Sequence, residues 1–303
     1  MTTQADIEAV LLPLGIEIGF YAEHLERKAT VAINPGVLFP TASVFKIAVM
    51  VELFHQSEAG RFGLDERMAT GEALRTIGSG VLQKLAGGLA PTLRDLCMLM
   101  IVVSDNTATE MLLDRVGAAN VTATMRRLGL HDIHVVLNLG ELFAHAYGLP
   151  LDPLPDYPTM QRISGERSMD YGSLSFAASG ENTTTSAADM ARLCAMIFRG
   201  TAANAASCAE MLTILKAQQL RDRVPRYLPT AAVGNKTGTF RGIRNDAGLI
   251  MRGADDTIAF GLFTFDRTVL PAGNSRGLVE RNILVNGTMA EVGQILWDGF
   301  AVA

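Results

Sequence analysis

The most informative side chains in this sequence are a serine and a lysine, Ser43 and Lys46, which open an apolar segment. Residues three apart in a helix share one face, so the lysine amine is expected beside the serine hydroxyl. A hydroxyl is a poor nucleophile at neutral pH unless a neighbouring base takes its proton. Burial lowers the pKa of a lysine, which suits Lys46 to that task. The alternative interpretation is a capping serine followed by a solvated lysine.

A second short motif, Ser104-Asp105-Asn106, supplies a hydroxyl and a carboxamide. Ser104 can relay a proton to a leaving group, and Asn106 can present its amide to a substrate carbonyl. Taken alone, the tripeptide is equally typical of a helix terminus, because all three residue types cap helices.

A third motif, Lys236-Thr237-Gly238-Thr239, is expected on an edge strand. Lys236 supplies positive charge beside the relay serine and attracts an anionic substrate. Gly238 leaves one wall clear for a ligand lying along the strand. Alone it is also consistent with a strand followed by a turn. Three such motifs on a helix start, a helix-linking loop and an edge strand favour a serine-nucleophile site.

The elements that must position these motifs follow from the periodicity of the chain. Alternation predicts two hairpins, with strands over 15–22 and 30–34 and over 245–252 and 257–265. Helices are expected over 7–12, 43–54, 92–103, 107–116, 120–128, 187–198, 209–218 and from about 280 to 297 or beyond. Residues 131–182, which contain four prolines, are predicted to form a long irregular loop.

Strands near both ends with helices between them predict an α+β fold, an antiparallel sheet flanked by helices plus an all-helical lobe. With 303 residues, 49% of them apolar, the chain can form a single large domain over 1–303. We expect an α/β lobe from residues 1–54 and 201–303, and a helical lobe from 55–200 that includes the loop 131–182.

Composition excludes several classes of protein. The net charge of −5 and the scattered Lys and Arg residues argue against a nucleic-acid partner. No apolar run approaches the ~18–20 residues of a membrane span, so no membrane partner is expected. Cys97, Cys194 and Cys208 lack C-x-x-C spacing and are interpreted as free thiols, and no metal or other cofactor is expected.

The first residues lack a basic segment followed by a long apolar one, which predicts a cytoplasmic protein. The periplasm or the exterior becomes the expected location if a leader has been removed.

The three motifs with their flanks resemble those of the class A β-lactamases, within the penicillin-recognising serine hydrolases. The resemblance rests on four segments and extends over most of residues 15–300: Phe39 to Lys46, Val103 to Ala108, Asn182 to Thr185 and Lys236 to Thr239. It implies the β-lactamase/transpeptidase-like fold and an acyl-enzyme mechanism.

The same resemblance implies roles for individual residues. Ser43 would be the acylated nucleophile and Lys46 the general base or its partner. Ser104 would pass a proton to the leaving nitrogen, assisted by Lys236. Asn106 would hold the substrate amide.

Further residues would bind the substrate. The backbone N–H groups of Ser43 and Thr239 would form the oxyanion hole. Thr237 and Thr239 would bind a substrate carboxylate beside Gly238. Arg244 is interpreted either as part of that positive field or as a solvated arginine.

One departure from the family is expected to matter. Class A enzymes carry a Glu-x-x-Leu-Asn element whose Glu positions the hydrolytic water, and this pattern is not found here. The stretch from Asn106 to Asn182 is also longer than the family's, which implies an insertion. Four acids are candidate replacements, the alternative being no dedicated carboxylate: Glu141, Glu166, Asp170 and Glu181.

Three functional hypotheses follow. The first is a serine hydrolase that opens a β-lactam or related amide through an acyl-enzyme. The second is a hydrolase of a non-lactam ester, amide or peptide with the same machinery. The third is a penicillin-binding or sensing domain that acylates and does not turn over. In each case the partner is a small molecule, expected to carry an anionic group.

Overall fold

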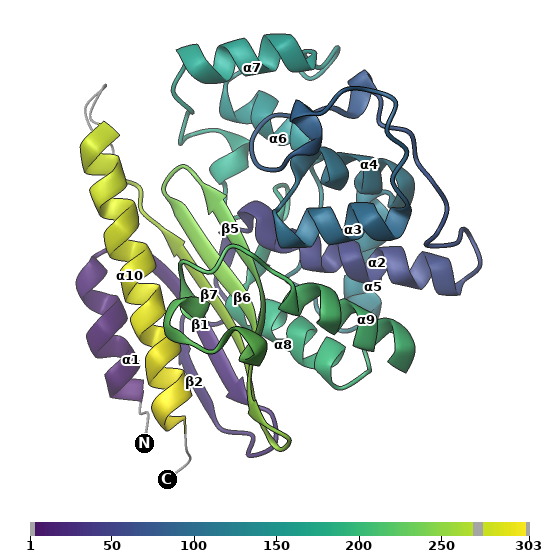
Figure 1. Cartoon of the computed structure of the whole chain (residues 1–303). Helices are drawn as coiled ribbons and strands as arrows, with labels where there is room; N and C mark the ends of the chain where they lie inside the picture. Colours follow the sequence, from purple (N-terminus) through teal and green to yellow (C-terminus); the bar gives the residue numbers. More distant parts are fainter. Residues whose placement is uncertain (1–3, 269–274, 301–303) are drawn as a thin grey trace.

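The computed structural model describes residues 4–268 and 275–300, and its centre is a five-stranded antiparallel sheet. The strand order is β2-β1-β7-β6-β5, so strands from both ends of the chain pair in the middle (Figure 1). The predicted α+β fold is therefore confirmed. The strands are β1 (Glu17–His24), β2 (Thr30–Ile33), β5 (Val233–Phe240), β6 (Ile243–Gly253) and β7 (Asp256–Phe265).

Two helices from the ends of the chain cover one face of the sheet. These are α1 (Gln4–Leu11) and α10 (Ser275–Gly299), which lie side by side (Figure 1). Their apolar sides pack with side chains from the strands, such as Phe20, Phe260 and Leu262, to form a separate core. The last helix begins earlier than position 280, where the sequence predicts it.

The other face of the sheet carries the larger core and the remaining helices. Helix α8 (Ala187–Phe198) packs on β7, β1 and β6, and α9 (Ala205–Lys216) packs on β5. The bounds of α8 are those that the sequence predicts. Helices α2 (Lys46–Glu58), α3 (Leu93–Val102), α4 (Asn106–Val116) and α5 (Ala118–Arg127) complete this side.

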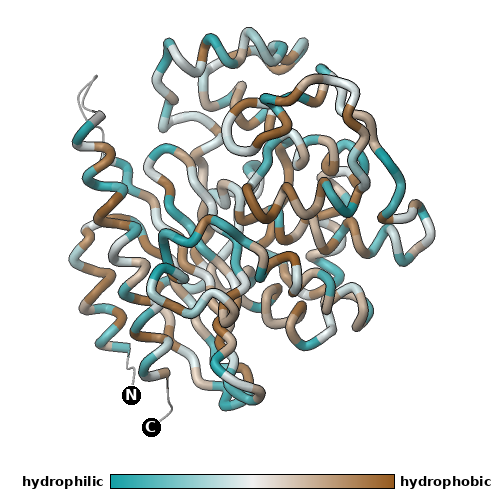
Figure 2. The backbone as a smooth tube through the Cα atoms, viewed as in Figure 1, coloured by the Kyte–Doolittle hydropathy of each residue, from teal (hydrophilic) through white to brown (hydrophobic). Residues whose placement is uncertain are grey.

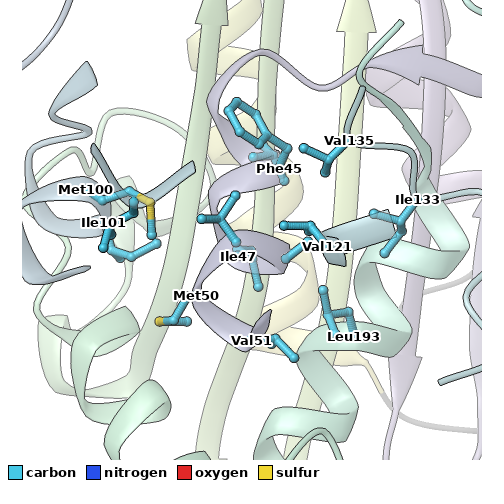
Figure 3. Packing of buried hydrophobic residues seen from close by; sticks show 14 of the residues in the cluster. Phe45, Ile47, Met50, Val51, Met100, Ile101, Val121, Ile133, Val135 and Leu193 are labelled. Carbon is cyan, nitrogen blue, oxygen red and sulfur yellow. The ribbon is translucent and has the colours of Figure 1, made fainter. Parts of the chain in front are cut away.

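Helix α2 runs through the middle of the larger core. Its residues from Lys46 to Phe54 are all buried, as its uniformly apolar sequence predicts. Ile47 and Met50 point toward the Met100 side of α3, and Val51 points toward Leu193 (Figure 3). Along the backbone, the central helices and strands contain many hydrophobic residues, and several of the outer loops are mainly hydrophilic (Figure 2).

The prediction of an irregular loop over 131–182 is wrong for two segments, α6 (Leu139–Ala146) and α7 (Tyr157–Glu166). Asn138 and Glu141 form a capping box that starts α6. Asp156 caps α7, and Pro158 lies in its first turn, where proline has no helical hydrogen bond to lose. A proline taken as a helix breaker therefore helps to start a helix here.

Short elements complete the chain. Strands β3 (Leu38–Pro40) and β4 (Thr184–Ser186) form a two-stranded antiparallel sheet. The 3₁₀ helices are η1 (Leu12–Leu14), η2 (Ala42–Phe45), η3 (Glu72–Leu74), η4 (Leu82–Lys84), η5 (Leu174–Phe176), η6 (Val224–Tyr227) and η7 (Thr230–Ala232). Within residues 4–268 and 275–300, no helix is both long and apolar enough to cross a bilayer.

Candidate active site

The three motifs meet at one cavity of about 320 Å³. It lies where η2, the turn before α4, helix α6 and strand β5 converge. Its lining residues are Ala42, Ser43, Gly78, Ser79, Ser104, Asn106, Leu139, Leu142, Phe143, Met169, Leu220, Thr237, Thr239, Phe240 and Arg241.

Ser43 is presented to this cavity by η2, directly before α2. The backbone N–H of Lys46 donates to the Ser43 carbonyl, so one helical turn joins the two residues. Ala42 has φ 44°, in the left-handed region that non-glycine residues rarely occupy. Such strain persists only where the surrounding structure enforces it, and it clusters at functional sites.

Strand β5 holds η2 by close contact. A Cβ atom at Gly238 would lie 2.5 Å from the Thr41 carbonyl oxygen, so only glycine permits this approach. The Asn245 side chain donates to the carbonyls of Pro40 (2.9 Å) and Thr41 (3.1 Å) from the next strand. Ser43 and Thr239 consequently line the same cavity, as the predicted oxyanion hole requires.

Lys46 is fully buried, and its amine is surrounded by three acceptors. Its Nζ lies 2.9 Å from the Ser104 carbonyl oxygen, 2.8 Å from Asn106 Oδ1 and 3.2 Å from Ser104 Oγ. Burial, followed by the charge of Lys236, holds its pKa well below the ordinary value of 10.5. Both effects favour the neutral amine over the ammonium form.

All three contacts can be donated by an ammonium group, whereas the neutral form of the amine would have two N–H donors and one lone pair. A carbonyl and a carboxamide oxygen can only accept, so in the neutral form the two N–H groups of Lys46 point to Ser104 O and Asn106 Oδ1. The lone pair is then left for the Ser104 hydroxyl. The sequence predicts the Lys46 amine beside Ser43. In the structure, the described hydrogen bonds of this amine go to the second motif, and its hydroxyl partner is Ser104.

The second motif forms the turn before α4, and each residue has a separate task. Ser104 has φ 57°, a second strained position beside the cavity. Asp105 caps α4 through the N–H of Ala108 and also accepts from the N–H groups of Val81 and Leu82, so its task is structural.

Asn106 accepts from Lys46 and donates to the carbonyl of Ile77 at 2.8 Å. Its second N–H remains available for a ligand in the cavity that it lines. Ser79 also lines this cavity and donates to the Ser104 carbonyl at 2.7 Å. The sequence analysis missed Ser79 because it lies in a glycine-rich loop without a motif.

Lys236 is buried on β5, and its Nζ donates to the Thr237 carbonyl at 2.8 Å. Burial and then the nearby Arg223 lower its pKa to about 7, and Asp246 offsets part of this effect. Its charge therefore changes within the physiological pH range.

Arg223 is a candidate site residue that is not among those predicted from the sequence. Its buried guanidinium donates to the Gly238 carbonyl at 2.7 Å and to Thr239 Oγ1. Because Thr239 Oγ1 accepts this bond, the Thr239 hydroxyl proton is free to donate to a ligand. Arg223 lies in an irregular segment before η6, where no motif marks it.

Arg244 takes part in the positive field. A second cavity of about 370 Å³ adjoins the first and shares Leu220, Thr237 and Thr239 with it; Arg223 and Arg244 line it too. Burial, and to a smaller extent the charge of Arg223, lower the pKa of Arg244 to about 10, and Asp222 in the same cavity offsets part of this effect. A substrate carboxylate would offset the repulsion between Arg223 and Arg244 further.

The candidate carboxylates lie elsewhere. Glu166 is exposed and pairs with Arg162 at 2.8 Å, and the exposed Asp170 accepts from the Gly172 N–H. Glu141 closes the capping box of α6, and Glu181 is exposed. Within the described part of the chain, no Asp or Glu lines the cavity around Ser43. The structure thus favours the alternative of no dedicated carboxylate.

Helix α6 presents apolar side chains where a water-holding acid was sought. Leu139, Leu142 and Phe143 line the cavity from this helix. Taking Leu142 as the Leu of Glu-x-x-Leu-Asn puts Leu139 in place of the Glu and Phe143 in place of the Asn. This alignment rests on the central leucine, whereas the candidates predicted from the sequence were all acids.

Ser43 and the edge of β5 line one cavity, and the buried Lys46 is hydrogen-bonded to two residues of its lining, Ser104 and Asn106. The family profile "Beta-lactamase2: Beta-lactamase enzyme family" matches residues 2–300. This chain belongs to the Beta-lactamase enzyme family.

The sequence identity to curated β-lactamases is low. It is 29% identical to β-lactamase PSE-4 of Pseudomonas aeruginosa over 145 residues, 46% of this chain and 50% of that protein. It is 33% identical to β-lactamase L2 of Stenotrophomonas maltophilia over 129 residues, 41% of this chain and 42% of that protein. The matches thus span about half the length of these curated relatives or less.

Solved β-lactamase structures agree over nearly the whole chain. A β-lactamase from Sphaerobacter thermophilus superposes with a TM-score of 0.75 at 26% identity, covering 97% of this chain and 96% of that one. PBP-A superposes with a TM-score of 0.75 at 22% identity, covering 98% and 95%, which establishes a shared fold only. An ancestral class A β-lactamase gives 0.75 at 21%, covering 98% and 99%. The fold is that of the class A β-lactamases.

Proposed function

We propose that this protein is a serine hydrolase that forms an acyl-enzyme at Ser43 with a β-lactam or a related amide carrying a carboxylate, and that it releases the acyl group slowly. The observation that carries the first half is the buried Lys46 amine, whose pKa is lowered by burial and which is hydrogen-bonded to Ser104 beside Ser43. The second half rests on the apolar wall of α6.

In acylation, Ser43 Oγ attacks the carbonyl carbon and its proton passes to Lys46, directly or through Ser104. The backbone N–H groups of Ser43 and Thr239 stabilise the oxyanion. The C–N bond then breaks, and the leaving nitrogen takes a proton from the Ser104 hydroxyl. Lys46 returns the proton to Ser104, so the amine is neutral again.

Substrate carboxylate binding is assigned to the cationic edge of β5. The Thr239 hydroxyl, whose oxygen is held by Arg223, donates to the carboxylate, and Lys236 and Arg244 supply positive charge. The preference for an anionic substrate thus follows from the same strand that forms the oxyanion hole.

Deacylation requires a water molecule held and deprotonated near the acyl carbonyl. Leu139 and Phe143 offer neither hydrogen bonds nor a base at the α6 wall. Water must then be activated by the Lys46–Ser104 pair alone, which also serves acylation. We therefore expect acylation to outpace hydrolysis.

A second candidate is a hydrolase of non-lactam esters. The specific observation in its favour is the same apolar wall, which suits an ester with an apolar acyl group. Cleavage of p-nitrophenyl phenylacetate faster than that of benzylpenicillin would favour this alternative.

The proposal is tested by intact-protein mass spectrometry after exposure to benzylpenicillin. We expect a covalent adduct on the wild-type protein that persists for minutes or longer, and none on Ser43→Ala. Absence of an adduct and of turnover would remove the proposal. Fast turnover without an accumulating adduct would leave acylation standing and refute slow release.

A further inference from the structure

Glu110 lies outside the catalytic cavity and yet contacts its wall. It sits on α4, four residues after Asn106 and therefore on the same face of the helix. Its Oε2 accepts from the backbone N–H of Leu139 at 2.9 Å, and its carboxyl also accepts from the N–H of Gly140. One side chain thus joins the helix of the second motif to the start of α6.

The first turn of α6 shows why this contact matters. The N–H groups at the start of a helix have no partner within the helix. Asn138 accepts from the N–H of Glu141, and its carbonyl accepts from Leu142. The N–H groups of Leu139 and Gly140 remain, and Glu110 binds both. A negative charge there is also favoured by the helix dipole.

Helix α6 separates two spaces. Leu139 faces the catalytic cavity, whereas Gly140 and Glu110 line another cavity of about 520 Å³ on the other side. Glu110 is therefore partly buried behind the wall and reaches no substrate directly. Any change in its hold on α6 is transmitted to the wall through Leu139.

The charges around Glu110 leave it without a cationic hydrogen-bond partner among the described contacts. Arg75, in the same cavity, pairs with Glu72 at 3.2 Å and stacks on Tyr157 instead. The other ionisable groups facing Glu110 are Lys46 on α2, Asp114 on α4, Glu141 on α6 and Asp156 at the start of α7.

We propose that Glu110 is a positioning residue that sets the apolar wall beside Ser43, and that protonation of its carboxyl loosens this wall. An ionised carboxylate accepts both N–H groups of α6, while a protonated one loses acceptor capacity and needs an acceptor of its own.

The ionisation of Glu110 falls in a useful range. Burial raises its pKa from 4.5 to about 7, against the two N–H groups that lower it, and the charges of Glu141 and Asp114 raise it further. The carboxylate is therefore ionised above about pH 7 and protonated below. We therefore expect the apolar α6 wall to be held in place above about pH 7 and loosened below it.

Hydrogen exchange tests this without any catalysis. We expect protection of the Leu139 and Gly140 amides, corrected for intrinsic rates, to fall about fivefold or more between roughly pH 8.5 and 5.5. The Asp189 amide, capped by Ser186 in α8, serves as internal reference. Protection that stays level in the wild type over this range overturns the proposal, whether or not the variants fold.

Variants separate the contact from the general effect of pH. Glu110→Gln should show low protection at both ends of the range. Glu72→Gln, an acid in the same cavity that pairs with Arg75, should behave as wild type. Equal pH dependence in Glu110→Gln and wild type would refute the role of Glu110.

The effect on chemistry rests on the proposed function and is read as selectivity. We expect the acylation ratio of p-nitrophenyl phenylacetate to p-nitrophenyl acetate to change by about threefold or more in Glu110→Gln, because the larger acyl group contacts the wall. An unchanged ratio counts against the positioning role. If the wild-type protein is acylated by neither ester, the proposed function is refuted. The hydrogen-exchange experiment then decides the role of Glu110 alone.

Discussion

Lys46 and Lys236 are both buried, but their surroundings give them different tasks. Burial lowers the pKa of Lys46, and its amine is hydrogen-bonded to Ser104 and Asn106, which suits a base. Lys236 has a pKa of about 7, and its amine donates to the carbonyl of Thr237, a residue of the cavity lining, which suits a charge that titrates. The residue types alone do not distinguish these tasks; burial and neighbours do.

This difference predicts a pH dependence. Because the pKa of Lys236 is lowered to about 7, its charge is present below that pH and lost as pH rises through it. The acylation rate constant for an anionic substrate should therefore decline above about pH 7, measured by stopped flow with benzylpenicillin.

Two controls isolate Lys236. Lys236→Arg keeps its charge, so the decline should move beyond the accessible range. A neutral ester such as p-nitrophenyl acetate should lack the decline in the wild type. An equal decline for both substrates would assign it to another group.

Leu139 gives a second prediction at the residue scale. Leu139→Glu together with Phe143→Asn places an acid and an amide on the wall of the cavity. General base catalysis contributes about 10²–10⁴-fold, so we expect deacylation to accelerate by about tenfold or more. Decay of the adduct mass measures it. The control Leu139→Gln with Phe143→Asn adds polar groups without a base, and its deacylation rate should rise much less. Equal acceleration in the two double variants would refute the role of the base.

The residues that belong to short motifs can be predicted from the sequence, whereas residues that matter through tertiary contacts cannot. Ser43, Ser104 and Lys236 were assigned from short patterns, and the structure brings them to one region. Arg223 was not assigned, because its importance comes from reaching Thr239 and Gly238 across the fold. None of the predicted acids lines the cavity, because the α6 side of the cavity is apolar. No sequence motif indicates an apolar replacement for a catalytic acid.

At the scale of elements, the contact between β5 and η2 fixes the nucleophile. A Cβ atom at Gly238 would meet the Thr41 carbonyl at 2.5 Å and Val44 Cγ2 at 3.0 Å. Gly238→Ala should push η2 away, lower the free energy of unfolding by about 1–3 kcal/mol and reduce the acylation rate. Urea unfolding and adduct formation measure the two effects.

Gly234 on the same strand provides the matched control. Its nearest contacts to a new Cβ are 3.3 Å, to Leu215 and Lys216 of α9, away from the cavity. Gly234→Ala should cost less stability and leave the acylation rate near wild type. Similar losses of acylation in both variants would mean that the contact with η2 is unimportant.

Elements with a strong period were predicted well, and those that depend on caps were not. Helix α8 and the β6–β7 hairpin follow from periodicity and turn residues. The prolines around α6 and α7 predict a loop, whereas Asn138 and Asp156 start helices there. Composition averaged over a segment concealed these local signals.

At the scale of the whole molecule, the two faces of the sheet have separate cores. The core under α1 and α10 contains no residue of the catalytic cavity among those described. Arg252 secures this side: it pairs with Asp256 and donates to the carbonyls of Leu296, Trp297 and Phe300 near the end of α10.

Arg252→Met should therefore lower the free energy of unfolding by at least about 1.5–3 kcal/mol, since hydrogen bonds to a charged group are lost. The rate of Ser43 acylation should stay near wild type. Arg276→Met, which removes an exposed pair with Glu280, should change neither quantity appreciably. A large loss of acylation in Arg252→Met would show that the two cores are coupled.

The global architecture was predictable because hairpins at both ends of the chain leave few topologies for one sheet. The substrate was not, because the fold fixes where a carbonyl is attacked while the side chains of α6, Met169 and Phe240 shape what surrounds it. These positions lie on segments whose local sequence does not reveal which cavity they face.

The central pairing of β1 with β7 has a consequence for synthesis of the protein. Phe20 pairs with Leu262, so the first hairpin leaves the ribosome with one edge unpaired and waits for some 240 residues. At ~5–20 residues per second this interval lasts about 10–50 s. A nascent chain halted before β7 should therefore be inert and prone to aggregate, and the site around Ser43 is completed only after β7 has been translated.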